Sequence, residues 1–270
     1  MKMHSIREED RGLFTLRLLQ TKVGYAGVVN KRSGGRIALI EGTDLGDVWR
    51  QLEDAAAKAG KDYIGFDGAK ARFRTFFEAG FDSPDYRREE REYKLRAKNK
   101  LDAAMPLETA LHANGFGEVA LTAFRDTNLL SPFEKMRVQD LLRGPSADRF
   151  IRAAARFTRS ADSSALAEMA QLAKQHDCAK WTTVTYLPFL WRPNQHMFLK
   201  PEVTKDFAER VGHSFVHIYA PALEMVVYDR LLDLAARTEH AISDLHPQDR
   251  IDVQSFIWVV GAYLDADMPK

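Results

Sequence analysis

The chain has 270 residues and a mass of 30.7 kDa, which is enough for one large domain or two small ones with a buried core. Hydrophobic residues make up 45% of the sequence and charged residues 29%, and this balance excludes a mostly disordered chain. The formal net charge of +1 excludes a general attraction to nucleic acid or membrane, so any such attraction has to come from a local patch.

The cysteine content and the N-terminus bear on the compartment. Cys178 is the only cysteine, so the chain forms no internal disulfide and suits a reducing compartment. Residues 1–12 lack the apolar core of a signal peptide, and no run is apolar and long enough for a transmembrane helix. We therefore expect a cytoplasmic protein that has no membrane partner.

The first third of the sequence predicts a small α+β unit. Strand-like runs occupy residues 12–20, 23–30 and 36–42, and the Gly34-Gly35 pair between the last two predicts a hairpin, because glycine adopts positive φ without steric cost. A helix is expected at 44–59, where Gly60 ends it, and a second one follows at 67–79. The loop before Gly34 is basic and is a possible phosphate contact, although solvated cations at a hairpin tip are commonplace.

The remainder predicts mainly helices. Ser83-Pro84 and the capping box that starts at Ser131 are helix starts, and the second helix is expected to end near Arg143. The stretch 181–187 is β-branched enough for a strand, although residues 186–188 can equally end a buried helix. The predicted fold is α+β and predominantly α, with a β-hairpin/helix unit at residues 1–82 and a helical, bundle-like body at 83–270, or the two as one continuous domain.

The helix expected at 84–105 has a thin apolar seam and many charges. Its C-terminal half carries the cations Lys94, Arg96, Lys98 and Lys100. Such a helix can follow a phosphate backbone. It can equally be a solvated connector with stabilising i,i+4 pairs such as Glu90/Lys94, which is the simpler interpretation of a helical charge run.

A second candidate region follows Trp181, where rings, prolines and polar side chains fall together. Rings can stack on bases, cations can meet phosphates, and amides can pair with base edges. These residue types predict a nucleic-acid contact surface made of Trp191, Arg192, Asn194, Gln195, His196 and Lys200. The alternative is that the rings belong to the core and that residues 193–196 form a turn.

The sequence contains no clear catalytic or metal motif. His213 and His217 have the i,i+4 spacing of a zinc pair, but no third ligand is evident. Nothing matches a phosphate loop, a dinucleotide fingerprint or a nucleophile elbow, so we expect no cofactor and name no catalytic residue. A metal-dependent nuclease would need clustered carboxylates, usually with a lysine nearby. The candidates are Asp249, Asp252 and Gln254, or Glu202 with Lys200.

These patterns lead to three ranked hypotheses of function. The first is a cytoplasmic, non-enzymatic protein that binds DNA or RNA through the segment at 191–200 and the lysine-rich helix. The alternative is an interaction or regulatory subunit with a protein partner and no nucleic acid. A metal-dependent nuclease is the third.

Overall fold

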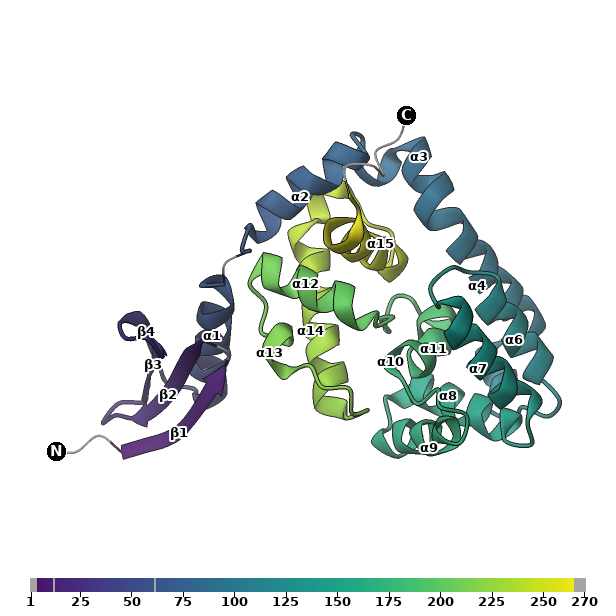
Figure 1. The fold of residues 1–270 in the computed structure, drawn as a ribbon, viewed down its shortest axis with the longest axis horizontal. Coiled ribbons are helices and arrows are strands. Elements are labelled where there is room, and N and C mark those ends of the chain that lie inside the picture. Colours follow the sequence, from purple (N-terminus) through teal and green to yellow (C-terminus); the bar gives the residue numbers. More distant parts are fainter. Residues whose placement is uncertain (1–3, 12, 61, 265–270) are drawn as a thin grey trace. The chain divides into compact units, whose positions relative to one another are not determined.

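The computed structural model describes residues 4–11, 13–60 and 62–264 (Figure 1). The predictions for residues 1–3 and 12 lie outside this part of the chain. Contacts divide the chain into a first unit of Met1–Ala69 with Lys205–Tyr219 and a second unit of Lys70–Thr204 with Ala220–Lys270. The predicted fold class is confirmed, since a four-stranded antiparallel sheet near the N-terminus is followed by a mainly helical body.

The sheet of the first unit is a simple meander in the order β1-β2-β3-β4. Its strands are β1 (His4–Arg11), β2 (Phe14–Gln20), β3 (Tyr25–Lys31) and β4 (Arg36–Gly42). The glycine hairpin is confirmed, because Gly34 and Gly35 both have positive φ and the Lys31 N–H donates to the Gly35 carbonyl at 2.9 Å. The sequence analysis missed β1, whose charged residues hide the alternation of a strand.

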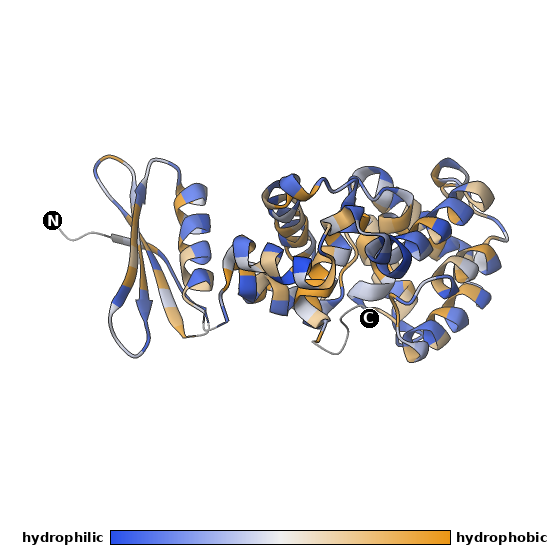
Figure 2. Ribbon diagram, turned by 90° about the horizontal axis from the view of Figure 1, so that it is seen from above, coloured by the Kyte–Doolittle hydropathy of each residue, from blue (hydrophilic) through white to orange (hydrophobic). Residues whose placement is uncertain are grey.

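Helix α1 (Leu45–Lys58) covers one face of this sheet, and the two form separate layers in Figure 2. Asp44 caps it by accepting a hydrogen bond from the Asp47 N–H at 2.7 Å. The alternation of β2 places Leu16 and Leu18 toward the helix, where they meet Leu52 in the core of the unit. This packing gives the unit its stability, because each fully buried leucine contributes about 1.5–3 kcal/mol.

The segment Lys205–Tyr219 completes the first unit. It holds most of α12 (Pro201–Val211) and the short α13 (Phe215–Ile218). The Ile64 N–H donates to the Arg210 carbonyl at 2.8 Å, and the rings of Phe66 and Phe207 meet edge to face. A segment far along the chain thereby packs on the N-terminal residues.

The second unit is helical. Its elements are the C-terminal part of α2 (Gly65–Phe76), η1 (Gly80–Asp82), α3 (Pro84–Tyr86), η2 (Arg87–Arg91), α4 (Glu92–Ala104), α5 (Leu107–Ala110), α6 (Gly117–Arg125), α7 (Pro132–Arg143), α8 (Ala147–Ser160), α9 (Ser163–Lys174), α10 (Trp181–Val184), α11 (Tyr186–Trp191), α14 (Met225–Ala241), η3 (Ser243–Leu245) and α15 (Arg250–Ala262). The capping box at Ser131 and the end of α7 at Arg143 are both confirmed. None of the described helices is long and apolar enough to cross a membrane.

The strand prediction for 181–187 is wrong, because the segment forms α10 and the start of α11. The alternative is correct that a buried helix lies here, but Tyr186 begins α11 and does not end a helix. Every residue from Trp181 to Trp191 is buried, so the alternation of a half-exposed strand is absent. Pro188 lies in the first turn of α11, where no intrahelical N–H donor is needed. Helix α11 packs against α4 and α8 as part of the core of the second unit.

Candidate functional site

The helix that begins at Pro84 buries part of its charged face. Between α3 and α4 the five residues of η2 form a π-helical turn, which shifts the register of the helix face. Glu90, Arg91 and Lys94 are buried, with exposed fractions of 4%, 8% and 0%. The prediction that Lys94 lies on a solvated face is therefore wrong, because the side chain is enclosed within the second unit.

One part of this buried cluster joins the π-turn to the start of α15. Arg91 donates to both carboxylate oxygens of Asp249, at 3.0 and 2.9 Å, and to Asp252 at 2.7 Å. Asp252 also accepts from the Tyr86 hydroxyl and from the Gln248 N–H. A buried arginine between two carboxylates is held firmly, since its planar fork matches their geometry.

The other part surrounds the Lys94 ammonium. Its Nζ donates to Glu90 Oε2 and to Ser255 Oγ, each at 2.8 Å. Glu90 Oε1 accepts from the Tyr263 hydroxyl at 2.8 Å. Burial lowers the pKa of Lys94, and the adjacent carboxylate of Glu90 opposes this shift. The predicted i,i+4 pair of Glu90 and Lys94 is thus confirmed, but it is buried where a surface pair was expected.

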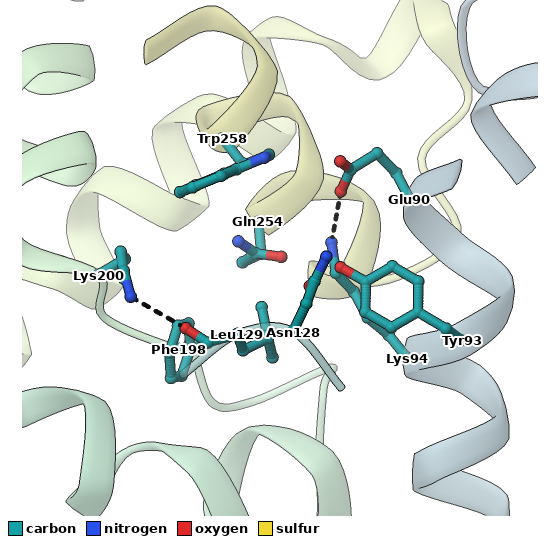
Figure 3. Close-up of a pocket in the computed structure, with 9 residues that line it drawn as sticks. All are labelled: Glu90, Tyr93, Lys94, Asn128, Leu129, Phe198, Lys200, Gln254 and Trp258. Atoms are coloured by element: carbon teal, nitrogen blue, oxygen red, sulfur yellow. Dashed lines mark hydrogen bonds and ion pairs between the residues drawn. The ribbon is translucent and has the colours of Figure 1, made fainter. Parts of the chain in front are cut away.

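Beside this ammonium lies a narrow pocket that we call the slot (Figure 3). Its cavity volume is about 20 Å³. This is room for one or two waters or for the edge of a flat group. Its lining comes from four separate stretches of the chain: Glu90, Tyr93, Lys94, Asn128, Leu129, Phe198, Lys200, Gln254 and Trp258.

The polar side chains that line the slot differ in whether their hydrogen-bonding atoms have partners. Figure 3 shows the amide of Gln254 between Lys200 on one side and the Glu90–Lys94 pair on the other. Gln254 is 4% exposed, and its Oε1 atom is buried with no hydrogen-bond donor among the described residues. Lys200 donates to the Leu129 carbonyl at 3.1 Å and lies 3.6 Å from a carboxylate oxygen of Glu134. An acceptor without a donor is costly when buried, so Gln254 is the residue a ligand would satisfy.

The predicted contact surface at 191–200 is not formed, because its two rings are buried. Trp191 is 1% exposed and donates its indole N–H to the Met105 carbonyl at 3.0 Å. His196 is 4% exposed and lies between the Tyr228 hydroxyl and the Thr158 carbonyl, at 2.7 and 2.8 Å. Burial lowers the pKa of His196, so the ring is held in its neutral form. The expectation that these two rings face solvent is wrong, because both fill the core of the second unit.

The rest of that segment forms a turn, as the alternative interpretation proposed. Arg192, Asn194 and Gln195 are exposed, and the Arg192 carbonyl accepts from two N–H groups that follow it. The Arg250 N–H fixes the turn by donating to the Pro193 carbonyl at 3.1 Å. Of the six predicted residues in this segment, Lys200 alone lines the slot.

The predicted cations of α4 are dispersed. Lys94 lines the slot, whereas Lys98 pairs with Asp102 one turn further on. Lys100 is exposed and lies 2.8 Å from Asp126, and Arg96 is exposed. The structure thus brings Lys94 and Lys200 together and leaves the other predicted residues apart.

The sequence analysis missed the residues that give the slot its character. The sequence places Tyr93 in an apolar seam and Gln254 beside Asp249 and Asp252 as a nuclease candidate, and it gives no signal for Asn128 or Trp258. The one available signal was a pair of amphipathic helices whose buried faces would carry polar residues, at 90–94 and at 252–255. The contact between these two helices depends on tertiary packing, because more than 150 residues separate Glu90 from Gln254 along the chain.

Three of the metal-binding candidates, Asp249, Asp252 and His213, have other contacts in this structure. Among the residues that the structure describes, no group of three or more His, Cys, Asp or Glu side chains is placed to hold a metal ion. Asp249 and Asp252 are bound to Arg91, and His213 Nδ1 accepts from the Phe215 N–H at 3.1 Å. Cys178 is buried, and burial raises the pKa of its thiol to about 12.

Comparison of the chain with models of known families, with curated proteins and with solved structures found no match.

Proposed function

We propose that this protein binds a nucleotide without catalysing a reaction, and that one edge of the base enters the slot beside Lys94. The ligand chemistry is a flat heterocycle with polar edges and a phosphate. This chemistry is shared by a free nucleotide and by an unpaired nucleotide of DNA or RNA, and we favour the second as the physiological source.

The observation that carries the proposal is the buried carbonyl oxygen of Gln254, which has no donor among the described residues and lies in a small pocket lined by aromatic rings. An exocyclic amino group of a base is a donor that would satisfy this oxygen, and the Asn128 amide offers a second edge contact. Tyr93, Phe198 and Trp258 supply ring surface for stacking. Because the cavity volume is only about 20 Å³, the edge of a planar group suits it better than a bulky group.

The two lysines of the slot favour an anionic substituent. Lys94 has three N–H donors, and the acceptors that the described residues supply are Glu90 and Ser255, so one donor remains for a ligand oxygen. Lys200 is part-exposed, which allows its ammonium to meet a phosphate at the mouth. One phosphate contact predicts a shallow salt dependence, with a slope of about −0.7 for a single strand.

Localisation and mode of action belong to the same proposal. We place the protein in the cytoplasm, because a chain with one cysteine forms no internal disulfide and needs no oxidising compartment. We assign it binding without chemistry, because the Lys94 and Asp252 side chains are engaged in the buried cluster that holds α15.

Fluorescence anisotropy with labelled single- and double-stranded oligonucleotides tests the proposal, with nucleoside monophosphates as competitors. Single strands should bind more tightly than duplexes, and Trp258→Ala should weaken binding by about 5- to 150-fold, as expected for the loss of one stacking face. Gln254→Leu should weaken it as well and should change the preference among the four bases. Arg192→Ala is the matched control, because this exposed cation lies in the predicted segment but not in the slot.

Two outcomes would contradict the proposal. Equal weakening by Arg192→Ala and Trp258→Ala would place binding on a diffuse surface. No affinity for any strand or monophosphate at low salt would favour the alternative of a regulatory subunit with a protein partner. Competition by monophosphates at the affinity of the oligonucleotide would identify a free nucleotide as the ligand.

A further inference from the structure

The first unit contains a second and larger cavity, which we call the basic cleft. It lies among β1, β2, the β3–β4 hairpin, the end of α1 and the segment of α12 and α13, all of which belong to that unit. Its volume is about 490 Å³, within the roughly 300–1,000 Å³ typical of small-molecule sites. The slot has room only for the edge of a flat group, whereas this cleft has room for a small organic molecule.

The basic cleft is lined by apolar side chains on one part and by basic side chains on another. Phe14, Ala56 and Val216 are among the apolar side chains on one part of it. Arg11, Lys31, Arg32 and His217 supply the basic part. Glu209 is the acidic side chain of the lining, so the cations outnumber it. A ligand that matches both parts has an apolar body and a negative end.

Two nitrogen atoms of the basic part are buried and have no partner among the residues that the structure describes. Arg11 binds Glu9 and approaches Glu53 through Nη2, but its Nε atom has no acceptor among the described residues. The Nε2 atom of His217 is likewise buried and without a partner in this part of the chain. Both side chains line the cleft. Burial lowers the pKa of His217, and the Arg11 charge lowers it further. Unpaired buried nitrogens beside a cavity are what an anionic oxygen would satisfy.

The glycine hairpin lies at one end of the basic cleft. Lys31 and Arg32 are exposed at its tip, and Arg32 lies no closer than 4.0 Å to the carboxylate of Asp10. Their long side chains are therefore available to neutralise a second negative charge at the mouth of the cleft. The sequence analysis noted this basic loop as a possible phosphate contact, and the structure adds the cavity beneath it.

We infer that the basic cleft binds a small amphipathic anion, namely a carboxylate or a phosphate monoester attached to an apolar chain or ring. The anionic group lies between Arg11 and His217, and the apolar portion lies on Phe14 and Val216. This inference does not depend on the nucleotide proposal, because the two sites belong to different units and share no residue.

Calorimetric titration of the full chain with hexanoate, hexyl phosphate, hexanol and inorganic phosphate tests the inference. Both amphipathic anions should bind, and the tighter of them identifies the head group. The affinities of hexanol and of inorganic phosphate should each be at least about tenfold lower, because hexanol lacks the charge and inorganic phosphate lacks the apolar part. The pKa of His217, followed by NMR, should rise on binding, since an anion stabilises the protonated ring.

Substitutions of opposite sign sharpen the test. Lys31→Ala should weaken binding of the amphipathic anion, and Glu209→Gln should strengthen it, each by about threefold or more. Lys22→Ala is the matched control, because Lys22 is an exposed lysine at the other hairpin and does not line the cleft. Thermal unfolding of each variant should match that of the wild type, so that a loss of binding is not a loss of fold.

Three results would overturn the inference. Hexanol binding as tightly as hexanoate would make the cleft a simple apolar cavity. Equal effects of Lys31→Ala and Lys22→Ala would show that only the overall charge matters. Absence of binding by all four compounds would leave the cleft without this function.

Discussion

Two charge-rich stretches of this chain look alike in sequence and have opposite environments. Strand β1, with the sequence HSIREEDR, exposes most of its charges, and its Glu8 pairs with Arg17 of β2 on the open face of the sheet. The stretch 84–94, with the sequence PDYRREEREYK, buries Glu90, Arg91 and Lys94 against α15. Composition alone therefore does not tell a solvated charge run from an internal ion network, and the difference should be measurable as stability.

The largest effect is expected from the buried arginine. Arg91→Ala leaves Asp249 and Asp252 close together and without their cation, and removing one partner of a buried pair typically costs about 3–5 kcal/mol. We expect the upper end of this range, because two carboxylates lose their partner at once. Urea unfolding of the full chain measures the change, and a loss below about 1 kcal/mol would show that solvent reaches the cluster.

The next effect concerns the pair at the slot. Lys94→Met should destabilise the second unit by about 3 kcal/mol, because it leaves the buried Glu90 carboxylate with only the Tyr263 hydroxyl. The double variant Glu90→Gln with Lys94→Met should recover most of this loss, since no buried charge then lacks a partner. If the double variant is as unstable as the sum of the two single ones, the charges are not coupled.

How much of this could be predicted depends on the range of the interactions involved. The glycine hairpin, the capping box at Ser131 and the ends of α1 and α7 follow from local backbone chemistry, and these predictions were confirmed to within about one residue. The π-turn that rotates Glu90 and Arg91 into the core has no local signature, because the same residues would suit a solvated helix.

The candidate sites needed still longer-range information. Trp191 and His196 had the residue types of a contact surface, but their burial depends on α8 and α14, which supply Thr158 and Tyr228. The slot combines segments near 90, 128, 200 and 254, and the basic cleft combines segments near 11, 31, 57 and 217. Neither grouping follows from spacing, since each forms only when distant elements pack.

A smaller effect is expected from His196 and should depend on pH. Burial holds its pKa in the folded state below the ordinary value of 6.5, so the unfolded chain binds more protons as the pH falls through 6.5. The free energy of unfolding should therefore decrease from pH 7 to pH 5, by at most about 1.4 kcal/mol per pH unit for this one group. His217 has a pKa shift of the same sign and adds to the trend.

Urea unfolding at pH 7.5, 6 and 5 measures this dependence, with His196→Asn as the comparison. The variant should be less stable at pH 7.5, because the contacts with Tyr228 and Thr158 are changed, but its stability should fall less steeply with acid. Parallel curves for the two proteins would mean that His196 keeps its ordinary pKa in the folded state, in conflict with its position between Tyr228 and Thr158.

The smallest effect on stability is expected from the exposed ion pair of Arg17 and Glu8. Arg17 meets Glu8 across β1 and β2 with two hydrogen bonds of 2.7 and 2.9 Å, a geometry as good as that of Arg91 with Asp249. Because both side chains stay in water, the ions lose little hydration and gain little attraction, and salt screens what remains. Arg17→Ala should leave the urea midpoint unchanged within error in 0.15 M salt, while Arg91→Ala lowers it strongly. A large effect of Arg17→Ala that persists in high salt would instead mean that this face of the sheet is covered, and that burial, not geometry, again sets the strength of the pair.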